Sequence, residues 1–160
     1  FTKVLSFNDY FSRGVLCVPF RSDATSEDVA DVIVHYLIRF YGKPLSIRSD
    51  RGSILISELL KVLYDKYGVK MCEGTAYHHE TVGLTERWNS TLKALLAAHK
   101  KASGDKQWHL YLPLLELCYN ASVNATTGYS PFFVMHLRHP DLPVDVLTGR
   151  PHHGRELPEY

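Results

Sequence analysis

The sequence predicts an α/β fold in which helices cover the faces of a mixed sheet. Two apolar β runs lie close together near the N-terminus, and short β runs then alternate with longer segments of helical periodicity. A length of 160 residues suits one domain with a core of its own. We expect that domain to occupy 1–140 and a tail to occupy 141–160.

The first two β runs predict a hairpin. From Val4 to Asp9 the chain alternates between two faces, which is typical of a strand. The run from Gly14 to Pro19 is apolar and follows after a short link. The two strands are therefore expected to be antiparallel neighbours, with Asp9 at the carboxyl end of the first.

The next segment predicts a helix over 25–41. Either Thr25 or Ser26 can cap its N-terminus, and acidic residues fill its first turn, where the helix dipole favours negative charge. Apolar residues then recur every three or four positions. Gly42 and Pro44 are expected to end it.

Two short β runs flank a second predicted helix. The first run covers 45–48, and Asp50 follows its carboxyl end. The helix covers 57–67 and ends at Gly68, and the second β run covers 69–72.

The rest of the chain predicts one loop and two longer helices. The segment 74–83 has two glycines and no periodicity, which indicates a mobile loop. Apolar stripes predict helices over 84–101 and 108–123. Beyond Pro131 the pattern weakens, and four prolines with no stripe indicate a linker over 137–160.

Composition excludes some classes of protein but does not select one. The net charge of +1 does not by itself indicate a nucleic-acid binder, and no stretch approaches the ~18 apolar residues of a membrane span. Basic residues do gather after Glu86: Arg87, Lys93, Lys100, Lys101 and Lys106. A run of this kind is also typical of a solvated helix face, and that alternative stays open.

Cysteine and histidine usage predicts neither a disulfide nor a zinc site. The three cysteines are Cys17, Cys72 and Cys118. Odd in number and far apart, they are expected to be buried thiols of a reducing compartment. His78, His79 and Glu80 are adjacent, and adjacent side chains chelate one ion poorly, so contact with phosphate is the better hypothesis for them.

Three carboxylates are the strongest indication of chemistry. Asp9 lies at the carboxyl end of a predicted strand, and Asp50 follows another. Glu86 is separated from Asp50 by 35 residues and lies near the start of a helix. Carboxylates that meet at one point can hold two Mg²⁺ or Mn²⁺ ions, with Asp9 as the expected bridge. Two such ions stabilise the attacking and leaving oxygens of a phosphoryl transfer, which favours a polynucleotidyl transferase.

The helix that begins near Glu86 presents a polar face. At helical spacing Glu86 shares that face with four further residues: Asn89, Ser90, Lys93 and Lys100. A carboxylate with lysines further along fits a DNA backbone lying on the helix. Trp88 points the other way and is expected in the core.

Six stretches, in this order, resemble the integrase catalytic core of retroviruses and of gypsy-type LTR retrotransposons. They are DYFSR at 9–13, SDRGS at 49–53, TAYH at 75–78, GLTERWN at 83–89, YN at 119–120 and TGYSPF at 127–132. The resemblance implies an RNase H-like fold with a five-stranded mixed sheet flanked by helices.

The resemblance also implies an activity and a set of roles. Asp9, Asp50 and Glu86 would be catalytic residues and ligands of two Mg²⁺ or Mn²⁺ ions. The implied reactions are trimming of the 3′ ends of element DNA and joining of those ends to host DNA, by a homodimer or higher oligomer in the nucleus. DNA-binding residues would be Ser53, His78, Arg87, Asn89, Lys93 and Lys100, and Gly83 would be the hinge of the active-site loop.

The chain departs from the family at several positions, which keeps two alternatives open. Where the family usually has His-Pro-Gln-Thr-Asp/Asn-Gly, this sequence has HHETVG at 78–83, so Glu80 adds negative charge and Val82 loses a polar contact. This favours a domesticated domain that binds DNA or protein without catalysis, whereas the intact carboxylates oppose it. A nuclease that cuts without joining is the other alternative.

Overall fold

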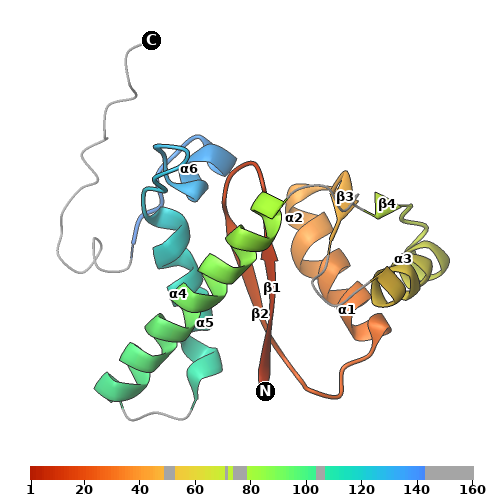
Figure 1. The fold of residues 1–160 in the computed structure, drawn as a ribbon, viewed down its shortest axis with the longest axis horizontal. Helices are drawn as coiled ribbons and strands as arrows, with labels where there is room; N and C mark the ends of the chain where they lie inside the picture. The colour runs from red at the N-terminus through yellow and green to blue at the C-terminus, as the bar shows by residue number, and fades with distance from the viewer. Residues whose placement is uncertain (49–52, 71, 74–78, 104–106, 143–160) are drawn as a thin grey trace. The chain divides into compact units, whose positions relative to one another are not determined.

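A computed structural model describes residues 1–48, 53–70, 72–73, 79–103 and 107–142 (Figure 1). It divides the chain into two compact units, and each is described by itself. The first unit consists of Phe1–Leu5 and Val18–Arg87, and the second of Ser6–Cys17 and Trp88–Tyr160.

The predicted N-terminal hairpin is confirmed. Strands β1 (Lys3–Asn8) and β2 (Val15–Phe20) form a two-stranded sheet. The N–H of Thr2 donates to the carbonyl of Phe20 at 3.1 Å, and the N–H of Asp9 donates to the carbonyl of Gly14 at 2.9 Å. Because these bonds join the start of each strand to the end of the other, the strands run antiparallel (Figure 1).

The outer edge of β2 is covered by helix α5 (Trp108–Ala121). Alternate residues of a strand direct their backbone groups away from its partner. On that outer side Asn120 Oδ1 accepts from the N–H of Val15 at 3.0 Å, and Asn120 Nδ2 donates to the carbonyl of Val15 at 2.8 Å. Glu116 Oε2 accepts from the N–H of Cys17 at 2.6 Å. Two side chains thus occupy the backbone groups that a further strand would use.

In the first unit, one helical run follows the hairpin. It consists of α1 (Ser26–Val32), the π-helical η1 (Ile33–Ile38) and α2 (Arg39–Tyr41). Thr25 is the cap: its hydroxyl accepts from the N–H of Asp28 at 3.3 Å, and the Asp28 carboxylate accepts from the N–H of Thr25 at 2.8 Å. The N–H and the hydroxyl of Thr25 both donate to the Asp28 carboxylate, and these two bonds lower the pKa of Asp28. Gly42, with φ 78°, ends the run as predicted, whereas the π-helical segment was not predicted.

Helix α3 (Ser53–Tyr67) begins four residues before the predicted start, and it packs against α1. Asp31 joins the two helices, because it accepts from Lys66 Nζ at 2.7 Å and from the Tyr67 hydroxyl at 2.6 Å. The same hydrogen bonds lower the pKa of Asp31. Strands β3 (Ser46–Ile47) and β4 (Cys72–Glu73) pair in parallel.

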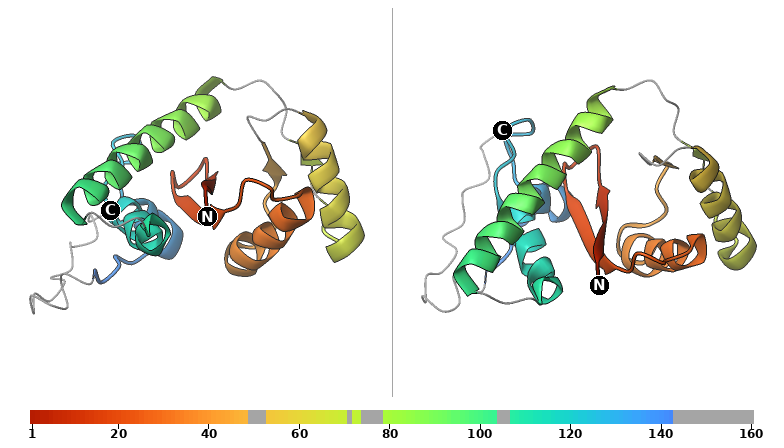
Figure 2. Two further views of the ribbon diagram at one scale, coloured as in Figure 1. Left: turned by 90° about the horizontal axis from the view of Figure 1, so that it is seen from below. Right: turned by 60° about the horizontal axis from the view of Figure 1, so that its bottom comes forward.

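Helix α4 (His79–Ser103) is longer than the sequence predicts, and both views in Figure 2 show it unbroken. The predicted loop is therefore wrong over 79–83, whereas 74–78 lie outside the described residues. Gly83 lies inside the helix, where an added Cβ would meet nothing within 4 Å. One glycine at an open helical position does not prevent helix formation, although it costs ~1 kcal/mol relative to alanine.

In the second unit, α5 is followed by a helix that was not predicted, α6 (Pro131–His136). Six residues are too few to show helical periodicity. Its start signals were present in the sequence, since Ser130 accepts from the N–H of Phe133 at 3.2 Å and Pro131 occupies the first turn.

Each unit buries its own apolar residues. The first unit buries Ala30, Ile33, Ile56 and Leu63, and the second buries Trp88, Leu92 and Leu112. The burial of Trp88, which is 1% exposed, confirms its predicted place in the core. No helix in the described part of the chain has the length and apolar character needed to cross a membrane.

The described residues contain four strands in two two-stranded sheets. The predicted α/β class is confirmed, whereas the five-stranded mixed sheet stays a prediction. The proposed boundary between 1–140 and 141–160 also stays a prediction, because 143–160 lie outside the described residues.

Candidate active site

The first predicted carboxylate, Asp9, directly follows β1 and begins the hairpin turn. Its Oδ2 accepts two hydrogen bonds from Ser12, one from the N–H at 2.8 Å and one from the hydroxyl at 2.6 Å. Its backbone carbonyl accepts from the N–H of Arg13 at 3.0 Å. Asp9 itself is exposed, so the turn holds one carboxylate oxygen while the residue remains accessible to solvent.

The turn is packed tightly from inside. Ser12 is 1% exposed, and its hydroxyl also accepts from the N–H of Gly14 at 3.1 Å. A Cβ at Gly14 would lie 2.9 Å from Met135 Cε and 3.0 Å from Ser12 Oγ, so only glycine fits this position without a shift. On the outer side, the Arg13 guanidinium lies 4.6 Å from the centre of the Tyr10 ring.

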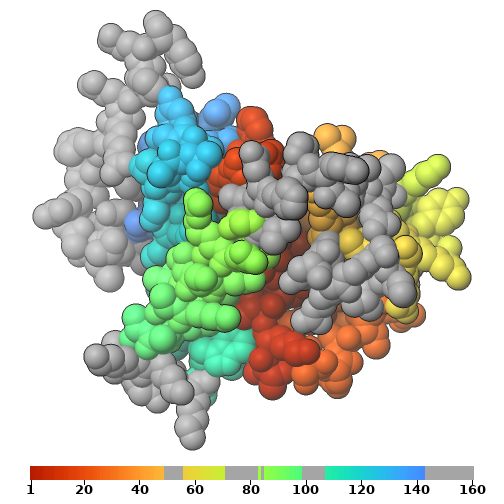
Figure 3. Space-filling view, viewed as in Figure 1, coloured from red at the N-terminus to blue at the C-terminus, as the bar shows by residue number. Residues whose placement is uncertain are grey.

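The third predicted carboxylate, Glu86, lies on α4 and is exposed. Arg87 and Lys93 are exposed as well, and Asn89 is half-buried. Atoms of α4 are visible at the molecular surface in Figure 3. The predicted polar face therefore exists over 86–93, whereas the side chain of Lys100 lies outside the described part.

Three other predicted residues lie wholly or partly outside the described part of the chain. Asp50 and His78 lie outside the described residues, and Ser53 is the first residue of α3, with a side chain outside the described part. Asp9 belongs to the second unit and Glu86 to the first, and their meeting with Asp50 stays a prediction. Among the residues that the structure describes, no three His, Cys, Asp or Glu side chains form a group able to hold a metal ion.

The chemistry of the donors fits a hard divalent cation. Carboxylate oxygens are the ligands that Mg²⁺ prefers, and Asp9 and Glu86 are both exposed. Ser12 contacts Oδ2 of Asp9, and among the described residues no hydrogen bond to Oδ1 is formed. The carboxylate of Asp9 could thus offer Oδ1 to a cation.

Sequence reasoning missed a half-buried carboxylate in the second unit, Glu116. Burial raises the pKa of Glu116 to about 7, against the opposing effect of the hydrogen bond from Cys17. Burial, together with the charge of Glu116, raises the pKa of the Cys17 thiol to about 12, and the Trp88 side chain opposes that rise. The sequence carried one sign of this carboxylate, since Glu116 stands four residues before Asn120 on a mainly apolar helix.

The cysteine prediction is correct at Cys17 and wrong at Cys118. Cys17 is buried, whereas Cys118 is exposed on α5, and both are free thiols. The side chain of Cys72 lies outside the described part. Position 118 is exposed because it follows Glu116 and precedes Asn120, the two residues that face β2, so it points to another side of the helix.

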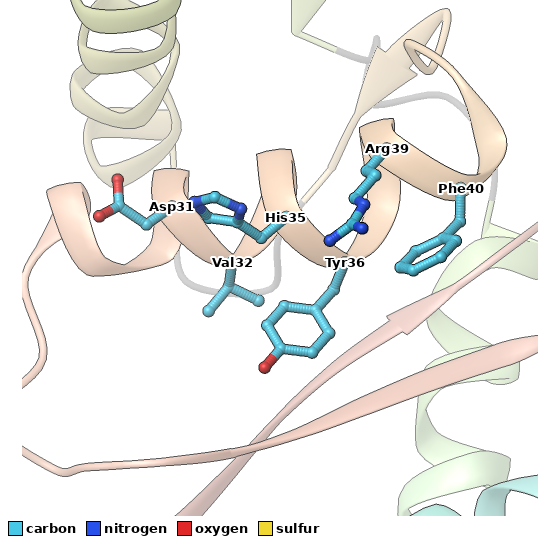
Figure 4. Close-up of a pocket in the computed structure, with 6 residues that line it drawn as sticks. All are labelled: Asp31, Val32, His35, Tyr36, Arg39 and Phe40. Carbon is cyan, nitrogen blue, oxygen red and sulfur yellow. The ribbon is translucent and has the colours of Figure 1, made fainter.

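A surface pocket lies along the helical run of the first unit, at a place that no prediction named. Its lining comes from one face of that run: Asp31, Val32, His35, Tyr36, Arg39 and Phe40 (Figure 4). Tyr36 is 48% exposed and Phe40 is 66% exposed, so this face is aromatic and open. None of these residues belongs to the six matching stretches.

Comparison with known proteins agrees with the resemblance. No protein-family model matches the chain. The Tf2-3 transposon polyprotein of Schizosaccharomyces pombe is 29% identical over 134 residues, which is 84% of this chain and 10% of the polyprotein. The chain thus spans about a tenth of the length of this curated relative.

Solved structures share the fold. The HTLV-2 integrase catalytic core domain in complex with magnesium, in its dimeric form, has a TM-score of 0.62 and 21% identity, and 83% of each chain is covered. The BIV integrase catalytic core domain has a TM-score of 0.62 and 23% identity over 84% of this chain and 86% of that one. The fold is thus the RNase H-like α/β fold of integrase cores. Motifs, sequence likeness and fold together confirm that this chain is similar to the integrase catalytic core of LTR retroelements.

Proposed function

We propose that this chain is the catalytic core of a polynucleotidyl transferase that integrates retroelement DNA into host DNA. It would trim the 3′ ends of the element DNA and join them to host DNA. The proposal rests on one combined observation: six ordered motifs occur together with sequence likeness to a transposon polyprotein over 84% of the chain.

Asp9, Asp50 and Glu86 would be the catalytic residues and would hold two Mg²⁺ or Mn²⁺ ions. The magnesium in the HTLV-2 core supports this choice of ion. When bound, such ions supply charge stabilisation at the attacking and leaving oxygens of phosphoryl transfer. The role of the chain is to present carboxylate oxygens in a fixed arrangement, as the turn at Asp9 does by holding Oδ2.

The DNA backbone would lie along α4 and the segments beside it. Exposed Lys93, on the face of Glu86, and exposed Arg87 beside it support this contact, since cationic side chains neutralise phosphates. The proposed contacts are Ser53, His78, Arg87, Asn89, Lys93 and Lys100. Gly83 is proposed as the hinge through which the N-terminal part of α4 adjusts to DNA.

Further parts of the proposal concern the whole protein. The core would span 1–140 with a five-stranded mixed sheet, and 141–160 would be a tail. It would act as a homodimer or higher oligomer, which the dimeric form of the HTLV-2 core supports. The place of action would be the nucleus of the host cell, where the target DNA lies.

The test is Mn²⁺- or Mg²⁺-dependent disintegration of a branched DNA oligonucleotide by the 160-residue chain. Disintegration is the reverse of DNA joining and depends least on other domains. Asp9→Asn and Glu86→Gln should each abolish cleavage and rejoining, because each removes a carboxylate ligand. Asp65→Asn and Glu58→Gln are the matched controls, since both are exposed carboxylates on α3 outside the motifs, and both should keep activity.

A different result would favour the domesticated domain. If the folded chain binds DNA but shows no metal-dependent turnover, binding without catalysis becomes the better function. Cleavage without rejoining would instead favour a nuclease. Equal activity in Asp9→Asn and in Asp65→Asn would remove Asp9 from the catalytic set.

A further inference from the structure

Ser12 stands out because it is buried, polar and bonded to a predicted metal ligand. It is 1% exposed, and both its N–H and its hydroxyl form hydrogen bonds within the turn. Its N–H and its hydroxyl both donate to Oδ2 of Asp9, at 2.8 and 2.6 Å, and its hydroxyl accepts from the N–H of Gly14 at 3.1 Å. A single residue therefore connects the carboxylate to the opposite side of the turn.

We propose that Ser12 is a positioning residue for Asp9, and that it holds Oδ2 so that Oδ1 is the oxygen presented to the divalent cation. This inference rests on the proposed function, because it takes Asp9 to be a metal ligand. It goes further in assigning separate tasks to the two oxygens of that carboxylate.

The physical reason lies in the freedom of an aspartate side chain. The terminal torsion of Asp has a broad, roughly two-fold preference, so an unsupported carboxylate samples many orientations. Two donors on one oxygen restrict that rotation, and one of them is backbone, which the closed turn fixes. Residues that orient a ligand in this way typically contribute 10–100-fold to metal affinity.

The surroundings of Ser12 keep its hydroxyl directed at the carboxylate. Gly14 leaves no Cβ in the space beside Ser12 Oγ, and Met135 of α6 fills that side of the turn. The N–H of Gly14 donates to the hydroxyl oxygen of Ser12. The hydroxyl proton then points away from Gly14 and is donated to Asp9.

The chain contains a matched control for Ser12. Ser130 is also buried, at 2% exposed, and its hydroxyl also accepts from a backbone N–H, that of Phe133. Its hydroxyl caps the N-terminus of α6, and among the described residues no carboxylate bonds to it. Ser12→Ala and Ser130→Ala therefore remove the same group from similar burial, and only the first removes a contact to Asp9.

The experiment is titration of the 160-residue chain with Mn²⁺ alone, with free Mn²⁺ measured by EPR spectroscopy and unfolding by urea recorded for every variant. We expect Ser12→Ala to weaken Mn²⁺ binding about tenfold or more, whereas Ser130→Ala keeps the wild-type affinity. Raised Mn²⁺ should restore disintegration activity to Ser12→Ala but not to Asp9→Asn. Ser12→Cys, nearly the same shape with a weak donor, should also lose affinity, and it serves if the alanine variant fails to fold.

Three results would overturn the inference. Wild-type affinity in Ser12→Ala and Ser12→Cys would show that Asp9 needs no support from Ser12. An equal loss in Ser130→Ala would show that lost stability, not orientation, weakens binding. If the wild-type chain binds no Mn²⁺, or if Asp9→Asn binds it as well as wild type, the proposed metal site fails and the role of Ser12 fails with it.

Discussion

At the scale of single residues, the second unit contains a carboxylate, that of Glu116, whose ionisation is disfavoured by burial. Glu116 is half-buried and accepts from the backbone of β2, and its burial raises its pKa from 4.5 to about 7. Desolvation disfavours the charged form of an acid, so the folded state favours the proton on Glu116 more than the unfolded state does.

This pKa shift predicts that stability falls as pH rises from about 4.5 to about 7. A raised folded-state pKa contributes stability that is fully present below the unfolded value and is lost as pH rises through the folded value. After allowance for solvent screening at a half-buried site, the loss from Glu116 should be ~1–3 kcal/mol. Urea unfolding at pH 5 and pH 8, roughly the two sides of this window, measures it.

Two variants make the pH prediction specific to Glu116. Glu116→Gln keeps an acceptor for the N–H of Cys17 but carries no charge, so its stability should change less between the two pH values. Glu58→Gln, on an exposed position of α3, should keep the wild-type slope. An unchanged slope in Glu116→Gln would contradict the assignment.

At the scale of elements, α5 is joined to β2 by side chains that substitute for a neighbouring strand. Asn120 offers one acceptor and one donor to Val15, as a backbone peptide of an adjacent strand would. The edge of a sheet otherwise presents unpaired backbone groups that can pair with another chain. The YN motif at 119–120 therefore has a structural role in this chain.

Asn120→Ala should destabilise the chain by about 2–4 kcal/mol, because it leaves both backbone groups of Val15 without partners in a buried place. Asn124→Ala is the control: its Oδ1 accepts only from the N–H of Thr126, at an exposed position, and should cost about 1 kcal/mol or less. Urea unfolding measures both. Equal losses would argue against the edge-covering role.

Two glycine substitutions should change stability in opposite directions. Gly14→Ala places a Cβ 3.0 Å from Ser12 Oγ, which its bond to Asp9 holds, and 2.9 Å from Met135 Cε, which can shift as the end of a flexible side chain, so it should cost about 1 kcal/mol. Gly83→Ala adds a methyl group at an open position within α4 and should stabilise by ~0.5–1 kcal/mol. Thermal unfolding measures both changes. Destabilisation by Gly83→Ala would instead favour the loop that the sequence pattern predicts for this segment.

At the scale of the whole molecule, the hairpin and α4 each contribute residues to both compact units. Asp9, which follows β1, belongs to the second unit, and Glu86 of α4 belongs to the first. The meeting of these carboxylates in one metal site stays a prediction.

Local sequence was enough to predict several elements. Alternation followed by a short apolar run predicted the hairpin. A cap at Thr25 or Ser26 with acidic residues after it predicted the start of the helical run, and the apolar stripe predicted α5. These features depend on neighbours within a few residues, where propensity and periodicity act directly. The resemblance likewise came from short motifs, and the fold comparison agrees with it.

By itself the sequence determined the fold class and the family resemblance, and it singled out three carboxylates whose role stays a prediction. Tertiary structure alone decided that Ser12 holds Oδ2 of Asp9, that Glu116 and Asn120 cover the edge of β2, and that α4 extends over His79–Gly83. Glu116 and Asn120 contact residues about a hundred positions away in the chain, and burial sets the pKa of Glu116. No local pattern encodes such contacts, because desolvation and hydrogen bonding depend on what the folded chain brings near.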